Sequence, residues 1–185
     1  MSALAIFVGD ERDPLARALR DAAGAFGVSC LVVEASAVDG VASVLEVLDR
    51  CAGPVALAGV GACAAIVACA AGVDGRAAAC VLVPDGGDDD GSVDRDQTAE
   101  LAANAPVPAR VDVLARARRI VCPTLIGQRA NQVERGGDAC GSLFAALTCV
   151  RRCVRGSDAL LAAEAIAWIA AAVYAEGGDD VDAIG

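Results

Sequence analysis

The sequence has no His and no Lys among its 185 residues, and aromatic residues make up only 3% of it. His is the usual general base near neutral pH, so its absence excludes Ser-His-Asp and Cys-His mechanisms and removes a ligand of most zinc sites. Any catalysis would depend on carboxylates, thiols, Arg, Tyr174, backbone groups or a bound cofactor. With so few rings, the core must consist of Ala, Val, Leu, Ile and Cys.

The charge balance is strongly acidic, with a formal net charge of -10. Nucleic-acid binding needs basic patches, so this charge argues against nucleic acid as a partner. All fifteen basic residues are Arg, and this composition is typical of a high-GC genome and of a saline cytoplasm. The first eight residues lack the basic start of a signal peptide, so we expect a cytoplasmic protein.

The nine cysteines are scattered and include no Cys-x-x-Cys pair. This pattern favours reduced thiols that act as small apolar side chains rather than a disulfide framework. The acidic segment 85–92 lacks the ligand spacing and the terminal Glu of an EF-hand calcium loop. We therefore expect no metal and no cofactor.

The segment 54–75 is the longest apolar stretch, and from Val55 to Val73 it has no charged or hydrogen-bonding side chain. Its length is that of a membrane span, but Ala, Gly and Val dominate it and no cluster of basic residues flanks it. We interpret it as a buried strand at 55–58, a glycine turn at 59–61 and a helix at 63–71, and we expect no membrane.

Strand and helix patterns alternate along most of the chain, which predicts an α/β fold, a three-layer sandwich with a mostly parallel sheet. Residues 1–176 are expected to form a single domain, and the acidic tail 177–185 is expected to be disordered. Asp13 and Pro14 predict a helix start, and Gly27 predicts its end, with Phe26 on the buried face. The expected strands cover 4–8, 30–34, 55–58, 78–83, 120–126 and 149–154. The expected helices cover 15–26, 38–51, 63–71, 98–104, 111–118, 138–147 and 159–175.

Several of these segments resemble the α/β-hydrolase superfamily, in particular its small dienelactone-hydrolase-like members. Segment 53–59, Gly-Pro-Val-Ala-Leu-Ala-Gly, is similar to the strand that enters the nucleophile turn of that family. Segment 120–127, Ile-Val-Cys-Pro-Thr-Leu-Ile-Gly, is similar to the late strand that precedes the catalytic acid. Segment 154–159 resembles the turn that holds the catalytic His, and 165–170 resembles the last helix. The resemblance implies an α/β-hydrolase fold.

The departures from that family fall on the catalytic positions, so the resemblance implies a missing triad. In one register the Gly-x-Ser-x-Gly motif places Gly61 at the nucleophile; in the other it places Cys63 there. The acid position falls near Asn131, and the His position holds Asp158 or Ala159. A thiol without a base needs a helix N-terminus or an Arg to be reactive, and Cys63 is expected at such a helix start.

The first half also resembles a second family, the carboxyaminoimidazole ribonucleotide mutases. Gly9-Asp-Glu-Arg-Asp13 is similar to their phosphate-binding loop, with Asp10 and Arg12 in place of two serines. Segments 26–28, 35–37 and 58–64 fit as well, but the catalytic His of that family is absent. This resemblance implies a phosphate- or nucleotide-binding site at Gly9, Asp10, Gly59, Gly61 and Ala62.

Three functions follow from these patterns. The first is a degenerate, non-catalytic α/β-hydrolase-like protein with a binding or structural role. The second is a cysteine-dependent hydrolase of small esters or lactones that uses Cys63, with Asp10 or Asp158 as a neighbour. The third is the phosphate- or nucleotide-binding domain. The partner, a small ligand or a protein, stays open, and the apolar helix at 159–174 leaves homo-oligomers open as well.

Overall fold

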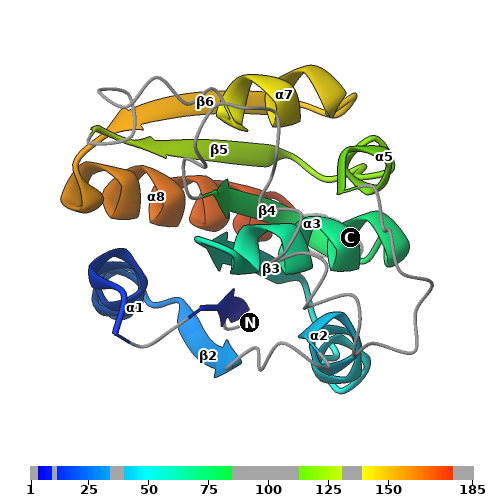
Figure 1. The fold of residues 1–185 in the computed structure, drawn as a ribbon. Coiled ribbons are helices and arrows are strands. Elements are labelled where there is room, and N and C mark those ends of the chain that lie inside the picture. The colour runs from blue at the N-terminus through cyan, green and yellow to red at the C-terminus, as the bar shows by residue number, and fades with distance from the viewer. Residues whose placement is uncertain (1–3, 10–11, 34–39, 85–112, 131–138, 177–185) are drawn as a thin grey trace, which may run out of the picture.

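The computed structural model describes residues 4–9, 12–33, 40–84, 113–130 and 139–176. Within them the chain forms one six-stranded sheet with the strand order β2-β1-β3-β4-β5-β6 (Figure 1). All five strand pairs are parallel. The strands are β1 (Leu4–Val8), β2 (Ser29–Val33), β3 (Val55–Val60), β4 (Ala77–Val83), β5 (Thr124–Arg129) and β6 (Arg151–Gly156). The helices are α1 (Pro14–Ala25), α2 (Gly40–Asp49), α3 (Cys63–Val73), α5 (Val113–Ala117), α7 (Ala139–Ala146) and α8 (Asp158–Glu176).

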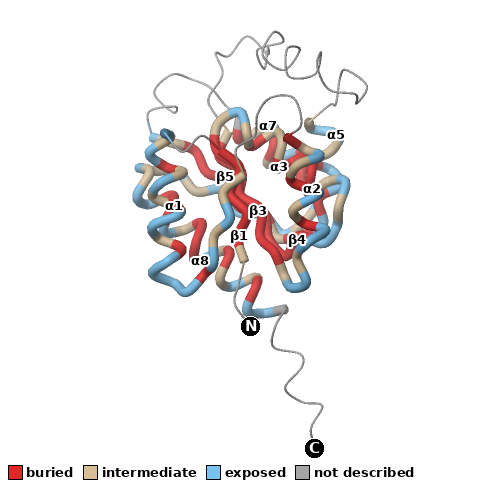
Figure 2. Tube along the Cα trace, turned by 90° about the horizontal axis from the view of Figure 1, so that it is seen from below, coloured by how far each residue is buried: buried red, intermediate tan, exposed pale blue. Residues whose placement is uncertain are grey.

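Helices cover both faces of the sheet and make the three layers predicted from the sequence. Helices α1 and α8 pack on one face, and α2, α3, α5 and α7 pack on the other (Figure 2). The central strands β3 and β4 are buried at every residue. Parallel strands need this double cover, which is why their sequences are continuous apolar runs rather than alternating ones.

The apolar segment 54–75 folds as strand, turn and helix, as its glycines predict. Strand β3 extends two residues further than expected, to Val60, and Gly61 follows in the left-handed region with φ 65°. Helix α3 begins at Cys63, and its residues Ala64, Val67, Ala68, Ala70 and Ala71 are buried. The segment is thus an interior element whose small side chains let neighbouring backbones approach closely.

Helix α8 is the one described helix that is long and apolar enough over Asp158–Ala175 to cross a membrane, by length and composition alone. A helix that covers a sheet passes the same test. Here α8 lies against α1 and β4, with Leu161, Ile166 and Ile169 fully buried. Its indole N–H at Trp168 donates to the carbonyl O of Pro123 at 3.3 Å, which holds α8 to the entrance of β5.

The structure corrects three local predictions. Phe26 is 53% exposed rather than buried, because α1 ends at Ala25 and Phe26 turns the chain toward Gly27, whose φ is 69°. The last strand begins at Arg151 rather than at 149. The strand expected at 120–126 covers Thr124–Arg129 instead, because Pro123 has no N–H for the sheet and β5 begins only after it. The expected helix at 98–104 and the tail 177–185 lie outside the described residues.

Candidate functional site

The candidate site lies at the carboxyl edge of the sheet, where parallel α/β proteins bind their ligands. Strands β1 and β3 are neighbours with Val8 opposite Gly59, so Gly9 and the turn from β3 into α3 come together at this edge. The sequence-predicted residues Gly9, Gly59, Gly61 and Ala62 are therefore adjacent. Asp10 and Asn131 lie outside the described residues.

The turn between β3 and α3 is made of backbone packed against backbone. A Cβ atom at Gly59 would lie 2.6 Å from the carbonyl O of Cys63 and 2.8 Å from the Cα of Ala64. The N–H of Gly61 donates to the carbonyl O of Val83 at 2.8 Å, which fixes the turn to β4. The positive φ of Gly61, which glycine adopts without steric cost, makes the sharp turn from β3 into α3.

Cys63 is the first residue of α3 and is half-buried. It packs against the core cluster on the α3 side of the sheet, together with Ile66. Asp158, its suggested neighbour, begins α8 on the opposite side. The fold thus places these two predicted residues on different faces of the sheet rather than in one constellation.

A cluster of charges, which sequence reasoning missed, lies on the α1 and α8 side of this edge. It consists of Arg129, the last residue of β5, with Asp13 and Asp158. The guanidinium of Arg129 pairs with the carboxylate of Asp13, and its Nε lies 3.1 Å from Oδ1 of Asp158. The three side chains are only 16%, 21% and 35% exposed, respectively. We call these three residues the Arg129 cluster.

Asp13 has two roles in this cluster. Its carboxylate caps α1 by accepting from the N–H of Leu15 at 2.7 Å and of Ala16 at 3.4 Å. Burial alone would raise the pKa of Asp13, but the hydrogen bonds from Arg129 and from Leu15 outweigh it and lower that pKa below its usual value. Asp13 is therefore a stable anion at neutral pH, committed to Arg129 and to the helix start.

No local signal pointed to the Arg129 cluster. Arg129 and Asp13 are 116 residues apart, and Arg129 and Asp158 are 29 apart. A charged residue at the end of an apolar central strand was the only available hint. Its partners follow from the strand order, which brings the starts of α1 and α8 to the end of β5.

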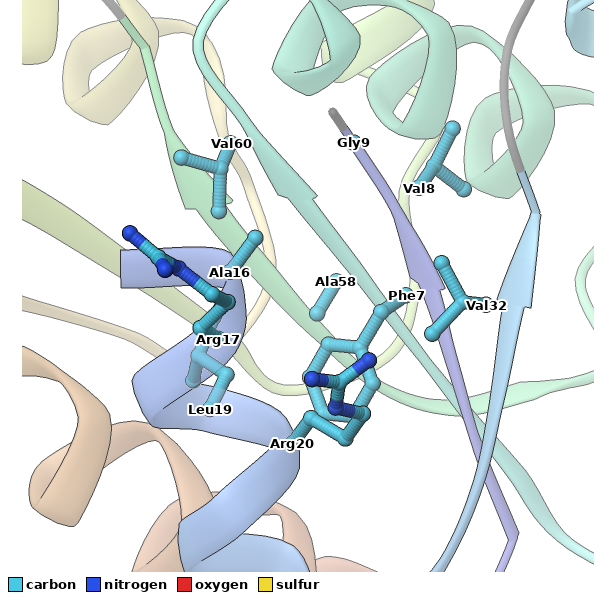
Figure 3. A pocket seen from close by; sticks show the side chains of 10 residues that line it. All are labelled: Phe7, Val8, Gly9, Ala16, Arg17, Leu19, Arg20, Val32, Ala58 and Val60. Atoms are coloured by element: carbon cyan, nitrogen blue, oxygen red, sulfur yellow. The ribbon is translucent and has the colours of Figure 1, made fainter. Parts of the chain in front are cut away.

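A shallow hollow opens beside this edge between α1 and the strands β1, β2 and β3 (Figure 3). Its walls are mostly apolar, with Phe7 and Val60 among them, while Arg17 and Arg20 reach over it from α1. It encloses only about 10 Å³, which is the space of a single water molecule.

The cysteine thiols are interior groups for the most part. None of the nine, all of which fall within the described residues, forms a disulfide. Burial raises the pKa of the Cys30, Cys69 and Cys80 thiols, so these three stay protonated at neutral pH. Among the described residues no group of three or more Cys, Asp or Glu side chains is placed to hold a metal ion.

Comparison with known proteins finds solved structures of similar fold, but no protein that matches in the two sequence comparisons. No family model and no curated protein matches the sequence. Solved structures do match. The esterase domain of a Rhodothermus marinus protein aligns with a TM-score of 0.68 and 14% identity over 93% of this chain and 88% of its own.

Two further solved structures also align with most of this chain. Est1E from Butyrivibrio proteoclasticus aligns with a TM-score of 0.63 and 15% identity over 89% of this chain and 85% of its own. A dienelactone hydrolase from Anabaena variabilis aligns with a TM-score of 0.60 and 11% identity over 93% and 87%. The chain therefore has the α/β-hydrolase fold, as the sequence resemblance implied. Identities this low establish the fold alone.

Proposed function

We propose that this chain is an α/β-hydrolase-fold protein with a binding or structural role and without triad chemistry. The observation that supports the proposal is the tip of the turn between β3 and α3. Gly61 occupies it in the left-handed conformation, so the turn keeps the shape of a nucleophile turn but presents no nucleophilic side chain. Of the two registers that the sequence left open, this geometry favours the one with glycine at the nucleophile.

The surroundings of the turn support the same proposal. The carboxylates of Asp13 and Asp158 at this edge are both paired with Arg129. A general base must be able to accept a proton near neutral pH, and the lowered pKa of Asp13 makes its carboxylate poorly suited to that task. The chain also has no His that could replace them. The proposal retains a cytoplasmic location and no binding to nucleic acid.

The test is a panel of small activated esters and lactones. Wild type, Cys63→Ala and Cys153→Ala should give the same rates, none of them saturable, because none of the described residues at this edge is an activated nucleophile. Cys153→Ala is the matched control, since Cys153 is an exposed thiol on β6. Saturable turnover that Cys63→Ala abolishes and Cys153→Ala retains would overturn the proposal and establish the thiol hydrolase.

A second candidate, phosphate or nucleotide binding, has one favourable observation. Ala62 precedes the eleven-residue helix α3 and offers no side chain to cap it, while the N–H groups of Ala64 and Ala65 donate to the carbonyl O of Gly61 at 3.1 Å and of Ala62 at 3.3 Å. A thermal-shift series with inorganic phosphate, nucleotides and sugar phosphates tests it. A ligand at 100 times its dissociation constant should add about 2.7 kcal/mol to the unfolding free energy. No shift with any of them would eliminate this candidate.

A further inference from the structure

The two edge strands of the sheet, β2 and β6, differ in how they face solvent. Each pairs with a single neighbour in the described part of the chain, β2 with β1 and β6 with β5. An edge strand leaves a row of backbone N–H and C=O groups available to another strand, so proteins usually protect such edges. Among the described residues, only one of these two edge strands carries such protection.

Strand β6 carries the usual protection. Arg151, Arg152 and Arg155 project from it, and two of its arginines reach neighbouring elements. The guanidinium of Arg152 pairs with Glu164 of α8 at 3.0 Å, and Arg151 lies over the ring of Phe144 at 4.6 Å. Two copies that met at this edge would bring like charges together, which opposes pairing.

Strand β2 itself has no such charged side chains. Its sequence, Ser-Cys-Leu-Val-Val over Ser29–Val33, contains no charge and no Pro and consists largely of residues that favour strands. Leu31 is 41% exposed, and Phe26, which precedes the strand by three residues, is 53% exposed. A short uncharged strand of this kind, left at an edge, is the pattern that pairs with another chain.

We propose that the outer edge of β2 is a self-association site, at which a second copy of this chain adds its own β2 antiparallel across a two-fold axis. Such an axis places one patch on itself, so the patch must be self-complementary. Backbone groups of antiparallel strands are complementary by construction, and the five side chains of β2 bring no like charges together. The result is one continuous sheet through two copies.

The overall charge modulates this pairing. Each copy carries a net charge of -10, so two copies repel one another at long range. Salt screens that repulsion and leaves short backbone hydrogen bonds largely unaffected. Pairing through β2 should therefore strengthen with added KCl. The proposal does not depend on whether the chain is catalytic, because β2 lies apart from the turn between β3 and α3.

The test measures the molar mass of the wild type in reducing buffer, by light scattering or sedimentation, at protein concentrations from about 1 µM to about 1 mM. Reductant prevents a trivial disulfide through Cys30 in the same strand. The mass should double with concentration. Leu31→Lys should move the midpoint at least tenfold higher, since it places two cations opposite each other. Val121→Lys is the matched control: Val121 is 70% exposed but lies before β5, so this variant should follow the wild type.

Hydrogen exchange locates the contact and keeps the test independent of any variant that fails to fold. In the wild type, amides within 29–33 should gain protection as the concentration rises, and those of α8 should not. Ser29→Lys gives a second exposed substitution in the same strand. A monomer at all concentrations overturns the proposal, as does a dimer that both lysine variants leave intact. Protection that appears on α8 instead also overturns it.

Discussion

Two regions at the carboxyl edge of the sheet are built in opposite ways. The turn between β3 and α3 holds together through close backbone contacts around Gly59 and has no polar side chain. The Arg129 cluster joins α1, β5 and α8 through three half-buried charged side chains. The first region is a sharp strand-to-helix turn made of small apolar residues. The second has charged groups, but they are committed to one another.

A backbone that turns sharply at a strand end needs small residues around it, and glycine at its tip adopts a positive φ without steric cost. Charged side chains at the same edge stabilise the fold when they form ion pairs or accept hydrogen bonds from a helix start. Substitutions in each region can be compared with matched substitutions elsewhere in the chain.

The largest effect is expected for Gly59→Ala. The new methyl group would lie within 3 Å of backbone atoms of α3, so the helix must shift, and we expect a loss of about 3 kcal/mol in unfolding free energy. Gly53→Ala is the control, since a Cβ there meets nothing within 4 Å. Chemical denaturation of both variants provides the measurement. Equal stabilities would show that the turn is not tightly packed.

Arg129→Gln should have the next largest effect. It leaves two half-buried carboxylates facing each other without a cation, which we expect to cost about 2 kcal/mol after allowance for partial exposure. Arg50→Gln breaks the pair with Glu46, whose side chains are 74% and 67% exposed, and should change stability by less than about 0.5 kcal/mol. If both variants lose the same amount, the cluster is an ordinary surface ion pair.

Asp13→Asn tests the charge while it retains a capping side chain, because Asn also caps helices well. We expect a loss of about 1 kcal/mol at pH 7. The folded-state pKa of Asp13 is lowered, so its contribution is present above the unfolded pKa of about 4 and is lost as the pH falls through the folded value.

The difference between wild type and Asp13→Asn should accordingly shrink in acid and vanish once Asp13 is protonated in both states. Unfolding curves collected from neutral pH down to strong acid supply the measurement. Asp21→Asn, an exposed position on α1, should match the wild type throughout. A difference that stays constant down to the lowest pH would mean that Asp13 acts through its shape alone.

The smallest effect concerns salt. An increase from about 0.1 M to about 1 M KCl shortens the screening length from about 10 Å to about 3 Å. The wild type should gain a few tenths of a kcal/mol, because its net charge of -10 repels itself. The loss in Arg129→Gln should persist at high salt, since half-buried pairs are screened less. A melting temperature that does not change with salt would contradict the expectation that this chain is adapted to a saline cytoplasm.

Much of the fold could be predicted because its elements are separated by clear local signals. Pro54 and the glycines at 59 and 61 divide an apolar stretch into strand, turn and helix, and Asp13 with Pro14 marks the start of α1. The position of Phe26 could not be predicted from helical periodicity. Periodicity does not record where the helix ends, and Phe26 lies one residue beyond it.

The candidate site was predictable in place but not in composition. Small residues after a buried strand pointed to the turn at 59–62, and the hydrolase resemblance pointed to the same residues. The proposed preference for Gly61 over Cys63 rests on the φ of Gly61, which two overlapping motifs in one sequence cannot supply. The Arg129 cluster needed the strand order, because its members are distant in the chain.

The sequence by itself determined the class of this protein. The alternation of apolar strands and amphipathic helices requires a covered parallel sheet, and the absence of His excludes the usual triads. Only the tertiary structure decided which side chains meet. It placed Gly61 at positive φ between β3 and α3, paired Arg129 with two distant carboxylates and, among the described residues, put the uncharged β2 at an edge of the sheet. The physical reason is that local patterns are set by neighbours in the chain, whereas ion pairs and sheet edges depend on strand order.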